Sequence, residues 1–102
     1  MTFAALLLVS LVSQVVFADQ EKGAKLYVAK QCITCHQAGG KGSGPFPNLA
    51  GKDSAFIQEN FINIQSGTRT TGMSSVMKAN PGVQSVTNEE IAEIADYLSN
   101  LK

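Results

Sequence analysis

The sequence predicts a small all-α domain in which three helices are joined by two long loops. The chain contains no sustained strand-like alternation of apolar and polar residues, and three segments carry helix-capping residues or helical spacing of apolar residues. The loops, residues 37–52 and 67–86, are rich in glycine and proline and too long for plain connections. Three short helices with such loops cannot close a core from side chains alone, so we expect a domain built around a large apolar ligand.

Length and charge limit the classes of function. The chain has 102 residues, in which 8 Lys and Arg balance 8 Asp and Glu. This length allows one small domain. A chain without excess positive charge lacks the basic face with which proteins bind nucleic acid or an anionic membrane surface, so we expect neither partner.

Residues 1–18 differ in composition from the rest of the chain. They hold 14 hydrophobic residues and no charged residue, and Val16-Phe17-Ala18 fits a signal-peptidase cleavage site. We therefore expect a signal peptide at 1–18 and a mature domain at 19–102, although no Lys or Arg precedes the apolar run. An uncleaved membrane anchor is the alternative, but Ser10, Ser13 and Gln14 interrupt the segment. Either interpretation predicts an exported, periplasmic bacterial protein.

The first two predicted helices cover residues 20–33 and 54–65. The first begins with the acidic Glu21, which favours a helix N-terminus, and ends at the paired cysteines. The second follows Asp53 or Ser54 as its cap and ends at Ser66-Gly67. Its apolar residues recur at i, i+4 and i+7, as Ile57, Phe61 and Ile64.

The third predicted helix has the clearest start. Thr87-Asn88-Glu89-Glu90 is a capping box, and Val86 and Ile91 flank it as a hydrophobic staple. An apolar stripe follows along one face, formed by Ile91, Ile94, Ala95, Leu98 and Leu101.

Cys32-Ile33-Thr34-Cys35-His36 is a C-x-x-C-H sequence, which is the attachment motif of c-type haem. Two thiols at this spacing can each add to one haem vinyl group as a thioether, and the adjacent imidazole reaches the iron. One covalent haem c per chain would also supply the missing core. A disulfide, a thioredoxin-like redox pair and a zinc site are the alternatives; the redox pair lacks a βαβ context, and zinc lacks a fourth Cys or His ligand.

The iron needs a sixth ligand or an open position, and the downstream candidates are Met73 and Met77. Met73 lies in a polar stretch, where a residue that only fills a core is unexpected. A thioether on the distal side saturates the iron and raises its reduction potential. That combination favours an electron carrier over an enzyme.

With these residues, the sequence resembles the class I c-type cytochromes, most closely the short bacterial monohaem forms and single domains of their dihaem relatives. Gly23 and Tyr27 resemble the first helix of the family, and Ala95-Asp96-Tyr97-Leu98 resembles the last helix, which crosses it. The resemblance implies the small cytochrome c fold, with three main helices and long loops wrapped around one haem. Glycine at position 23 suits a close crossing of two helix backbones, whereas the alternative is a frayed helix start.

The loop after the haem motif resembles the Pro-x-Leu loop of this family. The resemblance gives the carbonyl of Pro47 the role of accepting the His36 Nδ1–H, which orients the ring. It implies that Leu49 packs on the haem. Pro45 is a second proline in the same loop, and a stiff surface turn is the alternative for the whole segment.

Ser66-Gly67-Thr68-Arg69 resembles the segment before the axial methionine of these cytochromes. The resemblance implies that Arg69 lies near a haem propionate, and a solvated loop arginine is the alternative. Met73 followed by Val76 looks like the axial methionine. The segment 78–85 is longer than the corresponding segment of the family. Met77 lies nearer the last helix, at closer to the typical spacing, and is therefore the alternative ligand.

The resemblance implies a monomeric electron carrier that passes one electron between a donor and a terminal oxidase or reductase, with no membrane association after cleavage. The balanced charge predicts docking that depends only weakly on salt. The alternatives are a peroxidase, a small haem subunit of a dehydrogenase, and a gas or redox sensor. A peroxidase or a sensor would need an open or labile sixth position on the iron.

Overall fold

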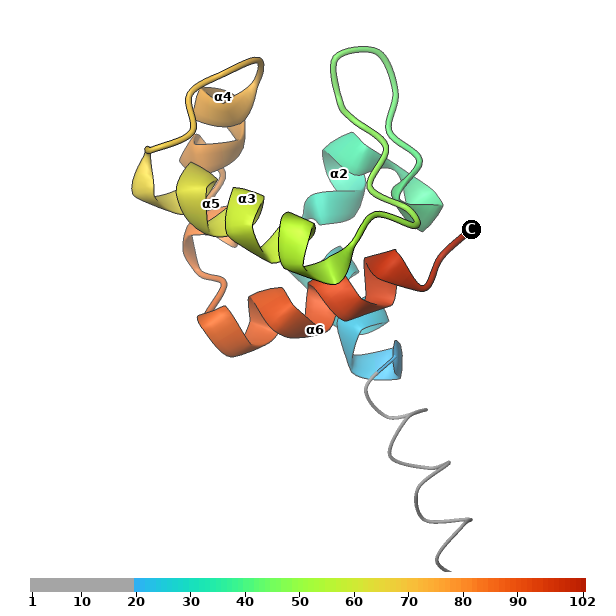
Figure 1. Ribbon diagram of the computed structural model, residues 1–102. Helices are drawn as coiled ribbons and strands as arrows, with labels where there is room; N and C mark the ends of the chain where they lie inside the picture. The colour runs from blue at the N-terminus through green and yellow to red at the C-terminus, as the bar shows by residue number, and fades with distance from the viewer. Residues whose placement is uncertain (1–19) are drawn as a thin grey trace, which may run out of the picture.

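The computed structural model describes residues 20–102, and Figure 1 shows how their helices are arranged. A first helix covers residues 20–29. The elements after it are α2 (Cys32–His36), the 3₁₀ turn η1 (Ala38–Gly40), α3 (Ser54–Ser66), α4 (Ser74–Ala79), α5 (Pro81–Gln84) and α6 (Asn88–Ser99). The described residues form no strand, only an isolated bridge between Ser43 and Phe46. The predicted all-α class is confirmed for these residues.

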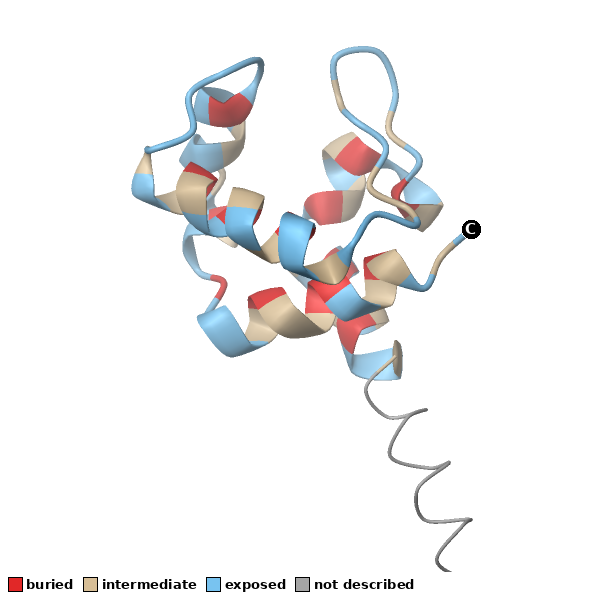
Figure 2. Cartoon of the chain, in the orientation of Figure 1, coloured by how far each residue is buried: buried red, intermediate tan, exposed pale blue. Residues whose placement is uncertain are grey.

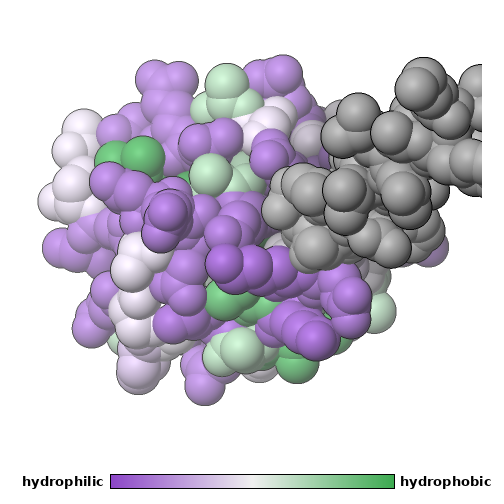
Figure 3. All heavy atoms as spheres, turned by 90° about the horizontal axis from the view of Figure 1, so that it is seen from below, coloured by the Kyte–Doolittle hydropathy of each residue, from purple (hydrophilic) through white to green (hydrophobic). Residues whose placement is uncertain are grey.

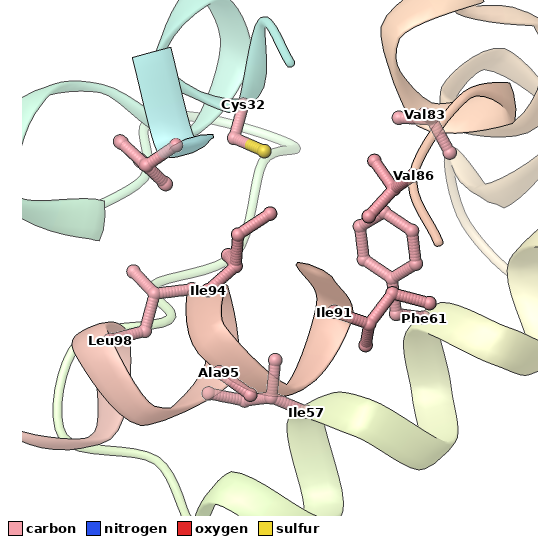
Figure 4. Close-up of a cluster of buried hydrophobic side chains, with 10 residues drawn as sticks. Cys32, Ile57, Phe61, Val83, Val86, Ile91, Ile94, Ala95 and Leu98 are labelled. Carbon is pink, nitrogen blue, oxygen red and sulfur yellow. The ribbon is translucent and has the colours of Figure 1, made fainter. Parts of the chain in front are cut away.

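The hydrophobic core lies on the inner faces of α3 and α6 and continues to α2. Ile91, Ile94 and Leu98 are at most 2% exposed and come from the predicted stripe of α6. Figure 2 shows that α6 carries buried positions as well as exposed ones. In Figure 4, Ile94 points from α6 toward Cys32, and Phe61 and Val83 lie to the right of it; all four belong to the core cluster.

The first helix crosses α6 at Gly23, as predicted. A Cβ atom at this position would lie 2.6 Å from the Cβ of Tyr97 and would also meet the carbonyl oxygen of Glu93. One turn on, the rings of Tyr27 and Tyr97 pack with centroids 5.8 Å apart. Only glycine permits backbones this close, because every other residue would place its Cβ inside the contact.

Both predicted capped starts are present. The carboxylate of Asp53, rather than Ser54, accepts the backbone N–H of Phe56 at 3.2 Å and begins α3. Thr87 and Glu90 form the complete capping box of α6, with bonds of 3.0 and 3.2 Å. The predicted end of α3 is also found, since Gly67 takes a left-handed conformation with φ 81°.

The first predicted helix is not continuous, and this is a correction. The expected helix over 20–33 ends at 29, and Gln31 adopts a left-handed conformation with φ 67°. Contacts distant in the sequence accompany the break: the Lys30 carbonyl packs against Gly82, and the Lys30 ammonium donates to the Ser85 hydroxyl at 3.1 Å. The new direction after the break allows Cys32 and His36 to face the interior.

Residues 67–86 form two short helices where the sequence predicts only a loop. Asn80 caps α5 by accepting the Gly82 N–H at 2.8 Å, with Pro81 in the first turn. The Gln65 side-chain amide on α3 donates to the carbonyls of Val83 and Val86, each at 2.9 Å. These bonds fasten the segment to α3, so tertiary contacts stabilise helices too short to persist alone.

The described part of the chain contains no helix long and apolar enough to cross a membrane. The predicted signal peptide at 1–18 lies outside the described residues. Seen from below the view of Figure 1, the surface is mostly hydrophilic, with small separate hydrophobic areas (Figure 3).

Candidate functional site

A cavity of about 500 Å³ occupies the centre of the described domain. Residues of α2, the 45–49 loop, α3, segment 69–77 and α6 line it. Figure 1 shows α2 and α4 on opposite sides of this space, with α6 below. The volume falls in the range of sites that enclose a ligand. Every residue that the sequence predicts as a site residue lines this cavity: Cys32, Cys35, His36, Pro47, Leu49, Arg69, Met73 and the alternative Met77.

His36 ends α2 and is 7% exposed. Its Nδ1 atom lies 3.0 Å from the carbonyl oxygen of Pro47. With Nδ1 engaged as a donor, Nε2 is the ring nitrogen left to bind a metal ion. The loop returns to the histidine through a tight turn at Gly42, whose φ is +73° and whose N–H donates to the His36 carbonyl at 2.8 Å.

The two cysteines are free thiols on α2, one buried and one half-buried. Burial raises the pKa of the Cys32 thiol to about 11, so this thiol is protonated and neutral at pH 7. A neutral sulfur suits the apolar wall of the cavity, where Figure 4 shows Cys32 beside Ile94. Residues 20–102 contain no group of three or more His, Cys, Asp or Glu side chains that could hold a metal ion.

Both candidate methionines reach the cavity, but in different surroundings. Met73 lies at the N-terminal end of α4 and is 38% exposed. Met77 lies one turn farther on and packs against the core cluster. The side chain of Met77 therefore already has apolar neighbours, whereas Met73 is more exposed.

The remaining predicted residues that line the cavity differ in burial and in contacts. Leu49 is half-buried and packs against the core cluster, while Pro47 is exposed. Arg69 is exposed, and its guanidinium donates to the hydroxyl of Ser74.

Sequence reasoning missed Lys52, Phe56 and Ser74, which also line the cavity. Among the described lining residues, Lys52 and Arg69 are the side chains of the Lys, Arg, Asp and Glu types, and both are cationic. Phe56 precedes Ile57 on α3 and is 55% exposed. No local sequence pattern distinguishes Lys52 from other surface lysines. The burial of Ser74 depends on its hydrogen bonds with Arg69 and Thr71, which the sequence does not reveal.

The cavity fits haem c in its chemistry. One wall carries two thiols and an imidazole, and the facing segment carries thioethers. Apolar side chains of α3 and α6 cover the remainder, and two cations near the cavity suit the two propionates. The single C-x-x-C-H motif matches one haem per chain.

Comparison with known proteins gives the same result. The family model described as cytochrome c matches residues 20–102. Cytochrome c-554(548) of Halomonas halodenitrificans is 33% identical over 70 residues, which are 68% of this chain and 82% of that protein. Cytochrome c-554(547) of Halothiobacillus neapolitanus is 30% identical over 90 residues, 82% of this chain and 98% of that protein. Cytochrome c-552 of Acidithiobacillus ferridurans is 33% identical over 70 residues, and the match spans only 28% of its length.

Proposed function

Because the chain belongs to the class I c-type cytochromes, which carry covalent haem c and transfer electrons, we propose that it is a periplasmic carrier with His36 and Met73 as iron ligands. One observation carries this proposal: the thiols of Cys32 and Cys35, the His36 imidazole and the Met73 side chain all line one cavity. The bound haem supplies an iron centre that gains and loses one electron.

The chain holds and orients this group through α2 and the loop that follows it. Cys32 and Cys35 supply the two thioether sulfurs. The Pro47 carbonyl, 3.0 Å from Nδ1, fixes the His36 ring so that Nε2 is the free ligand atom. The hydrogen bond also makes the imidazole a stronger donor to a metal.

Two features support Met73 over Met77 as the sixth ligand. Met77 packs against the core cluster, so turning its sulfur to the iron would remove an apolar contact from the core. Met73 is 38% exposed, so less of its surface is committed to packing within the protein. A methionine in this role closes the distal position to oxygen and peroxide, which favours a carrier over a peroxidase or a sensor.

Partner proteins dock, in this proposal, on apolar side chains next to the cavity. Phe56 and Val76 line it and are 55% and 56% exposed. Because the amino-acid charges sum to zero, electrostatic steering is weak, and the association rate should depend little on salt. A terminal oxidase or reductase is the proposed acceptor, and the carrier acts as a monomer.

Separate replacement of the two methionines tests the ligand assignment. Met73→Ala should make the ferric haem high-spin, lower its reduction potential and allow carbon monoxide to bind the ferrous protein. Met77→Ala should keep a low-spin spectrum and lower stability only, by about 2–5 kcal/mol for a buried methionine and less for this half-buried one. The reverse pattern would assign Met77, and carbon monoxide binding to the unmodified ferrous protein would favour a sensor or peroxidase.

Export is tested by the mass of the protein purified from the periplasm. Cleavage after Ala18 gives a mature chain that begins at Asp19. A full-length chain in the membrane fraction would instead support the uncleaved anchor.

A further inference from the structure

Ser74 is a buried polar residue beside the candidate iron ligand. It directly follows Met73, begins α4, lines the cavity and is 3% exposed. In Figure 2, α4 carries a buried position, whereas the loop that leads to it is exposed. A buried serine must find hydrogen-bond partners within the protein, because an unpaired hydroxyl there is costly.

The Ser74 hydroxyl has partners on both sides. It donates to the carbonyl oxygen of Thr71 at 2.6 Å and accepts an N–H from the Arg69 guanidinium. The backbone N–H of Ser74 also donates to the Thr71 carbonyl at 3.2 Å. The side chain therefore joins two points of the loop that comes before Met73.

The same loop is anchored to α3 at its other end. The Arg69 backbone N–H donates to the carbonyl oxygen of Asn63 at 2.9 Å. Residues 68–73 are all exposed, so apolar packing contributes little to holding this segment. Its conformation depends on the hydrogen bonds that run from Asn63 through Arg69 to Ser74.

We propose that Ser74 is a positioning residue for Met73. Its hydroxyl, held between Arg69 and the Thr71 carbonyl, fixes the main chain at the start of α4 and keeps the adjacent thioether on the distal side of the cavity. The inference rests on the proposed ligand role of Met73. It gives Arg69 a structural task in this loop that is separate from its predicted contact with a propionate.

The test measures how easily imidazole replaces the sulfur ligand in the ferric holoprotein. Loss of the far-red absorption band of a sulfur–iron bond reports the exchange. Ser74→Ala removes the hydroxyl and should raise the apparent imidazole affinity about tenfold, as expected for one lost buried hydrogen-bonded group. Ser75→Ala is the matched control, because Ser75 is the next residue of α4 and is exposed. It should change the affinity less than about twofold, within the range of neutral surface substitutions.

Arg69→Gln provides a second variant at an exposed position, in case Ser74→Ala fails to fold or to attach haem. Arg69→Gln should also raise the apparent imidazole affinity. Ser74→Thr keeps a hydroxyl, so its imidazole affinity should be close to that of the unmodified protein. The double variant Arg69→Gln/Ser74→Ala should exceed neither single variant by much, because both remove one network.

Equal imidazole affinities in the Ser74→Ala and Ser75→Ala proteins would overturn the proposal. Lower thermal stability of Ser74→Ala with unchanged imidazole affinity would also overturn it, because a purely structural role predicts that result. Met73→Ala separates the two levels of inference. If this variant keeps the far-red band, the ligand assignment itself fails; if it loses the band while Ser74→Ala behaves like the control, only the positioning role fails.

Discussion

The phenol of Tyr27 donates a hydrogen bond of 2.5 Å to the carbonyl oxygen of Gln37, the residue directly after His36. Tyr27 is 1% exposed and lies in the first helix, so this bond ties that helix to the end of α2. Burial is the main cause that raises the pKa of Tyr27 to about 12, and the phenol therefore remains a donor at neutral pH.

Replacing Tyr27 with phenylalanine removes this bond and keeps the ring packing. The free energy of unfolding of the holoprotein should fall by about 1 kcal/mol at pH 7. A phenol whose pKa is raised by folding stabilises the fold below its unfolded value of 10.0, and this stability is lost as the pH rises toward 12. Denaturant unfolding at pH 7 and pH 11 should therefore show a smaller advantage of the tyrosine at pH 11. An advantage that is equal at both values would contradict the role of the phenol.

A second prediction concerns the crossing of the first helix and α6. Gly23→Ala should lower the free energy of unfolding by about 1–3 kcal/mol, because the added Cβ would overlap the Tyr97 side chain and the Glu93 carbonyl. Helix propensity alone predicts the opposite sign, a gain of about 1 kcal/mol. Ala29→Gly, at an exposed position of the same helix, measures the propensity effect in this protein. A stabilised Gly23→Ala protein would show that the helices can separate without loss.

Local signals explain why much of the fold is predictable from the sequence. Asp53 and the Thr87–Glu90 capping box act on backbone groups within three residues, so their effect does not depend on the rest of the fold. The C-x-x-C-H motif is likewise complete within five residues. The crossing at Gly23 is longer in range, and it was accessible only through the resemblance to a family.

The unpredicted features all depend on distant partners. The break at Gln31 accompanies packing of the Lys30 carbonyl against Gly82, and α5 depends on the Gln65 amide. The burial of Ser74 requires the Arg69 guanidinium. None of these contacts leaves a periodic pattern in the residues around it, so neither the short helices nor the polar network beside Met73 follows from the sequence.

The left-handed conformation of Gln31 provides a third test. An L-residue at φ 67° costs about 1–2 kcal/mol relative to glycine in this conformation, while glycine loses about 0.5–1 kcal/mol more chain entropy on folding. Gln31→Gly should therefore stabilise the holoprotein by about 0.5–1 kcal/mol. Gln31→Ala is the matched control and should leave stability nearly unchanged, because alanine meets the same backbone penalty. If both variants behave alike, backbone strain at Gln31 is not significant.

Glu90 links the capping box to pH. Its carboxylate accepts the Thr87 N–H at 3.0 Å and lies 3.8 Å from the Lys30 ammonium. The Thr87 hydrogen bond is the main cause that lowers the pKa of Glu90 below its usual value of 4.5. The charged carboxylate therefore stabilises the fold above pH 4.5, and this contribution is lost as the pH falls through the lowered value.

Glu90→Gln should thus lower the melting temperature at pH 7 and approach the unmodified protein in acid. Glu89→Gln, an exposed substitution in the same first turn, should show a smaller pH-dependent difference. Thermal melts between pH 3 and pH 7 measure both variants. A Glu90→Gln difference that grows toward low pH would contradict the assigned direction of the pKa shift.

Lys52 gives a prediction that depends on the haem itself. It lines the cavity, and no described residue forms an ion pair or hydrogen bond with its ammonium. A cation near the haem favours the reduced state, which carries one more electron. Lys52→Gln should therefore lower the reduction potential, by about 10–40 mV for an exposed charge worth about 0.2–1 kcal/mol. The shift should shrink at high salt, because mobile ions screen exposed charges.

Lys41→Gln is the matched control, since Lys41 is also exposed but does not line the cavity. Both variants lose one positive charge, so a general effect of net charge moves their potentials equally. A specific role of Lys52 beside a propionate requires the larger shift in Lys52→Gln. It also requires that the pH dependence of the reduction potential changes in Lys52→Gln and stays as in the unmodified protein in Lys41→Gln. Equal shifts in the two variants would assign Lys52 to the solvated surface.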